Sequence, residues 1–191
     1  MHRRVITFSK NVFLPLTTVC ANHCGYCYFR TPVQEGCIMP PVEAIRTLEA
    51  SAAVGCTEAL FTFGERPGLV PGFSAMLERF GYHDILDYVY DLSLEAIRCG
   101  LLPHTNAGIL TYQELSRLRT VNASMGLMLE TTADVPAHRN SPGKDPAVRI
   151  DMIENAGKLS IPFTTGILLG IGETMDDREE SLRVICDLHR R

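Results

Sequence analysis

Three cysteines near the start of the chain have a spacing that suits metal binding. Cys20, Cys24 and Cys27 lie in the segment CANHCGYCYFR with the pattern C-x3-C-x2-C. Thiolates bind zinc and iron–sulfur clusters, and closed structural sites of either kind usually have four protein ligands. An iron–sulfur cluster held by three thiolates would use all three cysteines and leave one iron open to another ligand. This is the interpretation that we prefer.

Three other interpretations remain open, and each fits the residues less well. A c-type haem site needs a histidine directly after its last cysteine, but position 28 is Tyr28. A thioredoxin-like redox pair of Cys24 and Cys27 would leave Cys20 without a role. A zinc site could include His23, but neighbouring side chains at positions 23 and 24 cannot easily point at one ion.

Cys37 is a further candidate ligand. It lies ten residues after Cys27, so the intervening loop could fold it back as a fourth thiolate. The chain has seven cysteines, an odd number that fits poorly with a set of disulfides. The other three lie in apolar segments, where we expect small buried side chains: Cys56, Cys99 and Cys186.

Polar residues follow the ends of several later apolar segments. Gly64 and Glu65 follow one such segment in FTFGERP, and Glu130 ends another in MGLMLET. A glycine lets a ligand approach the backbone, and a carboxylate beside it can accept charge-assisted hydrogen bonds from an ammonium group. An acid in the position of Glu130 would be out of place in a core. A further set follows the last apolar segment: Gly166, Gly170 and Glu173.

Two more groups are candidates for contact with a substrate. His104, Thr105 and Asn106 end the segment LLPHTNA, and we expect their side chains to reach the same face. His104 could carry a proton because the pKa of histidine lies near neutrality, although a hydrogen-bonded structural histidine is the alternative. Arg139 and Lys144 lie in the loop RNSPGKDP, which predicts a lid, a contact with the carboxylate of a cofactor, or an ordinary polar loop.

The elements that would position these residues alternate along the chain. Five short apolar segments without strict polar alternation indicate buried strands: 12–19, 58–63, 101–107, 123–129 and 162–170. Segments with helical spacing separate them. Repeated strand–helix units predict an α/β fold with a parallel sheet, which places the candidate residues at the carboxyl ends of the strands, where such folds carry out chemistry.

Capping residues mark several of the expected helices. Thr111 with Glu114 forms a capping box, and Asp145 precedes a proline that suits the first turn of a helix. A last helix is expected from about Thr174. Glycines expected just after helix ends are Gly55, Gly100 and Gly157.

Composition limits the classes of function. The chain has 191 residues, a net charge of −4 and no apolar run of 18 residues, so the sequence predicts neither a nucleic-acid footprint nor a membrane span. Arg3 and Arg4 lack the apolar stretch of a signal peptide behind them, and we expect a cytoplasmic protein.

The cysteine segment resembles the signature of the radical S-adenosylmethionine (SAM) superfamily. Its pattern C-x3-C-x-aromatic-C has Tyr26 at the aromatic position. The resemblance implies that Cys20, Cys24 and Cys27 hold a 4Fe–4S cluster whose fourth iron binds the amino and carboxylate groups of SAM. Reduction of this cluster would then cleave SAM and release a 5′-deoxyadenosyl radical.

The same resemblance implies roles for the residues at later strand ends. Gly64 and Glu65 would bind the SAM amino group, and Glu130 would bind the ribose hydroxyls. The segment GILLGIGE resembles the family pattern G-x-I-x-G-x-x-E, which lies against adenine. Its matching residues are Gly166, Gly170 and Glu173.

A narrower resemblance extends from about residue 6 to residue 190. Segments such as CTEALFTFGERP and IPFTTGILLGIGET are similar to the ring-closing subunits of 7,8-didemethyl-8-hydroxy-5-deazariboflavin synthases. This implies a lyase that acts on an adduct of tyrosine and a ribityl-diaminouracil, with loss of ammonia, in deazaflavin coenzyme biosynthesis. A second radical SAM enzyme would make the adduct, and an external one-electron reductant would be needed. The alternatives are another radical SAM enzyme or an inactive iron–sulfur-binding fragment.

The end of the chain predicts an incomplete fold. Five βα units cannot close a barrel of the usual eight, and the sequence ends in or just after its fifth helix. We therefore expect one domain over residues 1–191, a partial (β/α) TIM-like barrel of the radical SAM type that is truncated at its C-terminal end.

Overall fold

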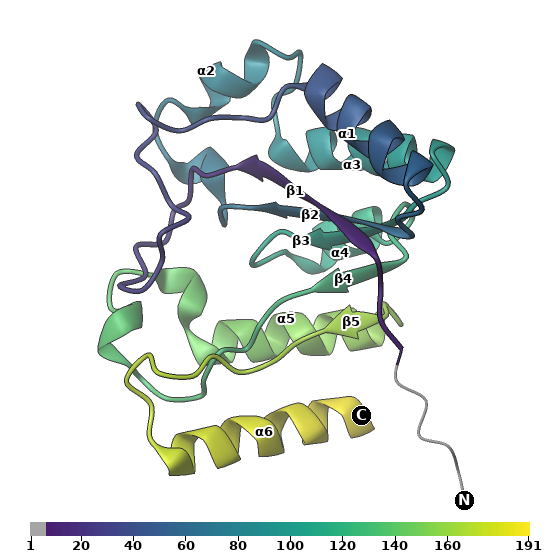
Figure 1. Ribbon diagram of the computed structural model, residues 1–191. Coiled ribbons are helices and arrows are strands. Elements are labelled where there is room, and N and C mark those ends of the chain that lie inside the picture. The colour runs from purple at the N-terminus through teal and green to yellow at the C-terminus, as the bar shows by residue number, and fades with distance from the viewer. Residues whose placement is uncertain (1–6) are drawn as a thin grey trace, which may run out of the picture.

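Five parallel strands form the centre of the protein in the computed structural model, which describes residues 7–191 (Figure 1). The strands are Asn11–Thr17 (β1), Glu58–Phe63 (β2), Leu102–Asn106 (β3), Ser124–Gly126 (β4) and Phe163–Thr164 (β5). They pair in the order β1-β2-β3-β4-β5, so each strand lies beside its neighbours in sequence. The predicted α/β fold with a parallel sheet is confirmed.

The last two strands are shorter than the apolar segments 123–129 and 162–170. Regular pairing between β4 and β5 covers only two residue pairs and resumes at an isolated bridge between Glu130 and Ile167. The backbone leaves the regular ladder just before the carboxyl end of the sheet, where the polar residues lie.

Helices connect the strands and pack around the outer face of the sheet (Figure 1). The α-helices are Pro41–Ala53 (α1), Phe73–Glu78 (α2), Ile85–Arg98 (α3), Tyr112–Leu118 (α4), Pro146–Lys158 (α5) and Met175–Arg190 (α6). Within residues 7–191, three short 3₁₀ helices lie in the loops: Pro67–Leu69 (η1), Pro136–His138 (η2) and Pro142–Lys144 (η3). The sequence patterns did not predict α2 or the 3₁₀ helices.

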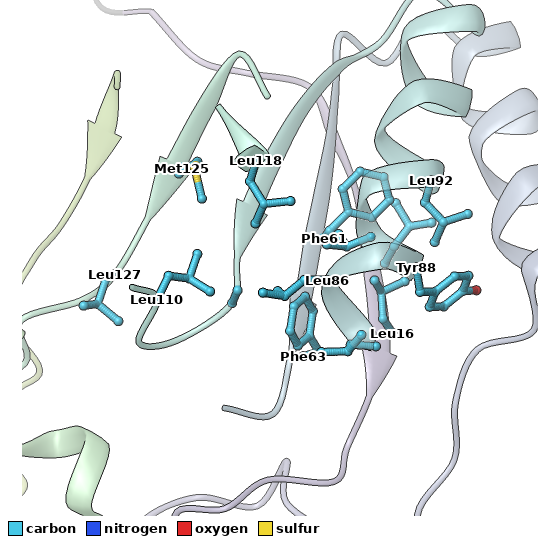
Figure 2. Packing of buried hydrophobic residues seen from close by; sticks show 14 of the residues in the cluster. Leu16, Phe61, Phe63, Leu86, Tyr88, Leu92, Leu110, Leu118, Met125 and Leu127 are labelled. Atoms are coloured by element: carbon cyan, nitrogen blue, oxygen red, sulfur yellow. The ribbon is translucent and has the colours of Figure 1, made fainter. Parts of the chain in front are cut away.

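The hydrophobic core lies between the sheet and these helices. Phe61 and Phe63 of β2 are buried beside Leu86 and Leu92 of α3 (Figure 2). Full burial of each such side chain contributes roughly 1.5–3 kcal/mol. The core therefore fixes the strands against the helices and with them the positions of the strand ends.

The side chains that alternate with the core residues project from the inner face of the sheet. His104 and Asn106 follow this alternation, but Thr105 is fully buried on the helix side, where its hydroxyl donates to Asn122 Oδ1 at 2.8 Å. The prediction that the three residues share one face is wrong for Thr105. Successive side chains of a strand point to opposite faces.

Most of the predicted helix ends are confirmed. Gly55 and Gly100 follow α1 and α3 with φ of 77° and 78°, and Thr111 makes both hydrogen bonds of its capping box. The prediction for Gly157 is wrong, because α5 continues past it to Lys158. Ser160, with φ of 52°, adopts the left-handed conformation after that helix instead.

The remaining cysteines differ in burial. Cys56 and Cys99 are partly buried, but Cys186 is exposed, so the prediction of burial is wrong for Cys186. Its helix, α6, buries only Ser181. The expectation that rests on Arg3 and Arg4 lies outside the described residues. No helix in the part of the chain that the structure describes is both long and apolar enough to cross a membrane.

Candidate active site

The loop after β1 and the ends of the next strands enclose a cavity of about 230 Å³. Residues from five separate segments reach it because the carboxyl ends of parallel strands lie at one edge of the sheet. The lining includes most of the predicted site residues: Cys20, Cys24, Tyr26, Cys27, Gly64, Glu65, Asn106, Glu130 and Lys144. It also includes residues that the sequence patterns did not indicate: Asn22, Thr62, Gly108, Met128 and Arg149.

The three cysteines present thiols of different exposure. Cys20 and Cys24 are partly buried, and Cys27 is exposed. The backbone N–H of Glu65 donates to Cys20 Sγ at 3.2 Å. Burial raises the pKa of the Cys20 thiol, and the nearby Glu65 carboxylate adds to the increase. A thiol in this setting needs a cation, such as iron, to hold it as thiolate.

The donor set fits an iron–sulfur cluster better than a single ion. Among residues 7–191, no three His, Cys, Asp or Glu side chains approach closely enough to hold one metal ion. A four-iron cluster is wider than one ion, so its thiolate ligands stand farther apart. His23 and Cys37 are exposed and do not line the cavity. The geometry therefore argues against the zinc site and against Cys37 as a fourth ligand.

Gly64 lets the β2 end approach the cysteine loop. A Cβ atom at this position would lie 2.0 Å from the backbone oxygen of Val19 and 2.7 Å from Cys20 Cβ. A side chain would therefore force the two segments apart. The backbone N–H of Ala21 donates to Glu65 O at 2.8 Å and fixes the same approach.

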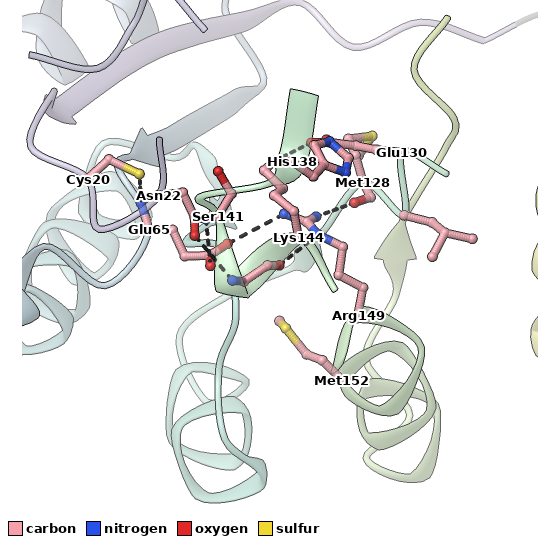
Figure 3. A network of polar contacts seen from close by, with 12 residues as sticks. Cys20, Asn22, Glu65, Met128, Glu130, His138, Ser141, Lys144, Arg149 and Met152 are labelled. Carbon is pink, nitrogen blue, oxygen red and sulfur yellow. Dashed lines mark hydrogen bonds and ion pairs between the residues drawn. The ribbon is translucent and has the colours of Figure 1, made fainter. Parts of the chain in front are cut away.

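Glu65 is a buried carboxylate that points toward the cavity loops. Asn22 Nδ2 donates to its Oε1 at 2.9 Å, and Arg149 Nη2 lies 3.5 Å from its Oε2 (Figure 3). A Cβ on Gly143 would lie 1.4 Å from the same Oε1, so this glycine is required for the loop to cover the carboxylate. Glu65 thus lies at the cavity, as expected from its place after an apolar segment. The sequence patterns did not indicate its partners Asn22 and Arg149.

Arg149 joins three segments around the cavity. Its side chain is 2% exposed, and it donates to Gly143 O at 2.9 Å and to Met128 O (Figure 3). It thereby ties α5 to the end of the β4 region, to the loop before α5 and, through Glu65, to the β2 end. A buried charge of this kind is stable only with such partners.

Glu130 lies in a dense polar cluster on the other side of the cavity (Figure 3). Lys144 Nζ donates to its Oε1, while the Tyr26 hydroxyl donates to its Oε2 and His138 Nε2 lies 3.1 Å from that oxygen. The backbone of Glu130 is left-handed, with φ of 68°, a costly conformation for a residue other than glycine. The side chain of this strained residue lines the cavity.

The charges of this cluster follow from its contacts. Burial alone would raise the pKa of Glu130, but the nearby Lys144 and Arg149 outweigh it and lower the pKa. Burial lowers the pKa of His138, and burial together with Glu130 raises the pKa of Tyr26. Both shifts favour an ionised Glu130 beside a neutral Tyr26 phenol that donates to it.

The last predicted set does not line the cavity. Glu173 accepts hydrogen bonds from the N–H groups of Gly170 and Ile171, each at 2.8 Å. It also forms an ion pair with Arg178. These backbone hydrogen bonds lower the pKa of Glu173 to about 2. Glu173 thus shapes its own loop. Gly166 instead lies beside Glu130, whose N–H donates to Gly166 O at 2.9 Å.

The tentative substrate residues have different positions. Asn106 lines the cavity, and His104 lies deeper on the inner face, 7% exposed. Lys144 reaches Glu130, but Arg139 is exposed and does not line the cavity.

Known proteins resemble this chain in sequence and in fold. A model of the radical SAM superfamily matches residues 14–185. The 7,8-didemethyl-8-hydroxy-5-deazariboflavin synthase of Methanoculleus marisnigri is 86% identical over 191 residues, which is 100% of this chain and 58% of that protein. The protein of the same name from Methanosphaerula palustris is 70% identical over 190 residues, again with 58% of its length covered. The chain therefore spans less than two thirds of the length of these relatives.

Solved structures share the fold. The crystal structure of HydG, a maturase of the [FeFe]-hydrogenase, matches 93% of this chain and 38% of that chain with a TM-score of 0.73 and 19% identity. The structure of anSMEcpe with bound AdoMet matches 94% and 46% with a TM-score of 0.55 and 16% identity. At these identities the likeness concerns the fold alone. Since the superfamily model matches most of the sequence, the chain belongs to the radical SAM superfamily.

Proposed function

We propose that this chain is the radical SAM core of a lyase of the deazaflavin synthase type. It would convert the adduct of tyrosine and a ribityl-diaminouracil to 7,8-didemethyl-8-hydroxy-5-deazariboflavin, with loss of ammonia. The observation that carries the proposal is the meeting of three thiols and two buried carboxylates, Glu65 and Glu130, at one cavity. The 86% identity to a synthase of that name supports the choice of substrate.

The cysteines would hold a 4Fe–4S cluster, and the surrounding residues would bind SAM. When bound, cluster and SAM would supply the reactive radical that begins the reaction. Glu65 would accept hydrogen bonds from the SAM ammonium group. Glu130 would accept hydrogen bonds from ribose hydroxyls, in exchange for those it now receives from Tyr26 and Lys144. Gly166, Gly170 and Glu173 would shape the loop beside adenine.

The substrate would lie on the inner face of the sheet. Asn106 lines the cavity, and His104 lies two residues earlier on the same face of β3. Both side chains can therefore reach a molecule that enters from the cavity. His104 is the proposed proton carrier. Lys144 would orient Glu130, and Arg139 would contact the substrate only if its loop moved inward.

The proposal requires two further participants. A second radical SAM enzyme would make the adduct, and an external one-electron donor would reduce the cluster. We infer that residues 1–191 act as one domain. Neither a nucleic acid nor a membrane is required by the chemistry.

The test is anaerobic turnover. The protein is reconstituted with iron and sulfide, reduced, and supplied with SAM and the adduct, and the deazaflavin product is measured against a Cys24→Ala control. Product formation that depends on Cys24 is the expected result. SAM cleavage without conversion of the adduct would indicate a different substrate, and a bound cluster without SAM cleavage would refute the proposed activity.

A further inference from the structure

His104 is held on the inner face of the sheet by a residue of the next strand. Its Nδ1 lies 2.7 Å from Ser124 Oγ, and β3 and β4 pair these two residues directly. The bond leaves the other ring nitrogen, Nε2, to point away from Ser124. The side chain of His104 is thus fixed by one neighbour at one of its two nitrogens.

Gly126 leaves room beside the free nitrogen. A Cβ atom on Gly126 would lie 3.0 Å from His104 Nε2 and 3.3 Å from Asn106 Oδ1. These two polar atoms therefore converge over backbone that bears no side chain. Contacts this short between a carbon and a polar atom are rare in proteins, so a methyl group would displace one of them.

The free nitrogen is accessible. Among the described residues, His104 Nε2 has no protein hydrogen-bond partner, and it is not among the fully buried side-chain atoms that lack one. An accessible polar atom beside a second one, Asn106 Oδ1, on a face that adjoins the cavity can contact a bound molecule. Asn106 itself lines that cavity.

The surroundings favour a neutral ligand. Ser124 and Gly126 of β4 and Asn106 of β3 carry no charge, and among residues 7–191 the charged group that acts on His104 is Glu58, at the start of β2. Burial lowers the pKa of His104 and outweighs the opposing effect of Glu58. A neutral imidazole has one N–H and one lone pair, and the Ser124 hydroxyl can donate to Nδ1 or accept from it, so Nε2 can present either one to an uncharged ligand.

We propose that Ser124 is a positioning residue that fixes the ring orientation of His104, so that Nε2 and Asn106 Oδ1 form a two-point hydrogen-bonding subsite over Gly126. Its ligand is an uncharged polar part of the substrate, a hydroxyl or a ring amide, and not a carboxylate or phosphate. The proposal deepens the function given above and rests on it for the identity of the substrate. The positioning by Ser124 does not depend on that identity.

The first test reads the imidazole directly. Histidine labelled with ¹⁵N in the oxidised, cluster-loaded protein should show a hydrogen-bonded Nδ1 for His104, assigned from the loss of its signal in His104→Gln. Ser124→Ala should shift the Nδ1 resonance and the titration of His104, and Ser124→Thr should restore both. Ser93→Ala is the matched control, because Ser93 is a buried serine whose hydroxyl donates within α3 to Val89 O at 2.7 Å.

The second test measures use of the subsite. Ser124→Ala should raise KM for the adduct about tenfold, as expected for the loss of one positioned hydrogen bond, while SAM cleavage is retained. Gly126→Ala should weaken adduct binding at least as much, because its methyl group would occupy the subsite. Ser93→Ala should change neither.

The outcomes separate the two proposals. An unchanged histidine spectrum and unchanged KM in Ser124→Ala would overturn the positioning role, while turnover by the unsubstituted protein would leave the proposed function standing. A spectrum that depends on Ser124 in a protein that does not convert the adduct would support the positioning role and refute the proposed substrate. Full adduct binding by Gly126→Ala would overturn the subsite.

Discussion

Arg149 is the residue on which the geometry of the cavity should depend most. Its guanidinium is nearly fully buried and contacts two backbone carbonyls and the Glu65 carboxylate. In Arg149→Met the side chain keeps much of its length but loses its charge and donors. The carboxylate of Glu65 would then remain buried with Asn22 as its main side-chain partner.

The expected cost can be divided into two parts. Removal of one partner of a buried ion pair typically destabilises a protein by about 3–5 kcal/mol. Loss of the hydrogen bonds to the two carbonyls accounts for about 1–3 kcal/mol of this. The remainder, about 2 kcal/mol, is the penalty for an uncompensated Glu65, so it should disappear in a Glu65→Gln background.

A double-mutant cycle measures this coupling. Free energies of unfolding are obtained by denaturant titration for the unsubstituted protein, Arg149→Met, Glu65→Gln and the double variant. Arg98→Ala serves as the control, because its ion pair with Glu95 is exposed and should contribute less than about 1 kcal/mol. Additivity of the two substitutions within about 0.5 kcal/mol would refute the ion pair as the link between α5 and the β2 end.

Three further outcomes are expected. Gly64→Ala should destabilise the protein and impair cluster loading because its Cβ would meet the Val19 carbonyl, whereas Gly157→Ala, in open space within α5, should stabilise it by about 0.5–1 kcal/mol; thermal melts and iron content check both. Glu130→Gln should retain the cluster but weaken SAM binding about tenfold or more in equilibrium titrations, and unchanged affinity would exclude Glu130 from the SAM site. Since burial lowers the pKa of His104 below 6.5, the unfolded chain binds more protons between the two pKa values, so the unfolding free energy should rise with pH through that window. His104→Gln should flatten this rise, and an identical slope in the variant would contradict the assigned burial.

The sequence predicted the fold well where its signals are local. Each apolar segment contains a strand, and Thr111 and Asp145 begin helices as expected. The local signal was insufficient at the end of α5, where more than one position could end the helix. Gly157 fits a helix end by type, but α5 continues one residue further to Lys158, and the buried Leu159 is its C-cap.

Only some residues of the candidate site could be predicted from the sequence. The acids directly follow strand ends, but the residues that pair with them do not. Glu65 and Glu130 could be found from their positions after apolar segments. Arg149 looks like an ordinary helix residue in the sequence, and only the packing of α5 brings it within reach of Glu65. His138 lies in a loop whose path depends on distant contacts such as the N–H of Gly25 donating to Ala137 O at 2.8 Å.

The most direct test of the central claim is the cleavage of SAM by the reconstituted protein. The protein is loaded with iron and sulfide under anaerobic conditions and reduced with dithionite, and 5′-deoxyadenosine is quantified after addition of SAM. Formation well above that of Cys24→Ala, and its loss in Glu65→Gln with the cluster retained, is the predicted result. A fully loaded cluster that yields no more 5′-deoxyadenosine than Cys24→Ala would contradict the assignment of this cavity as a radical SAM site.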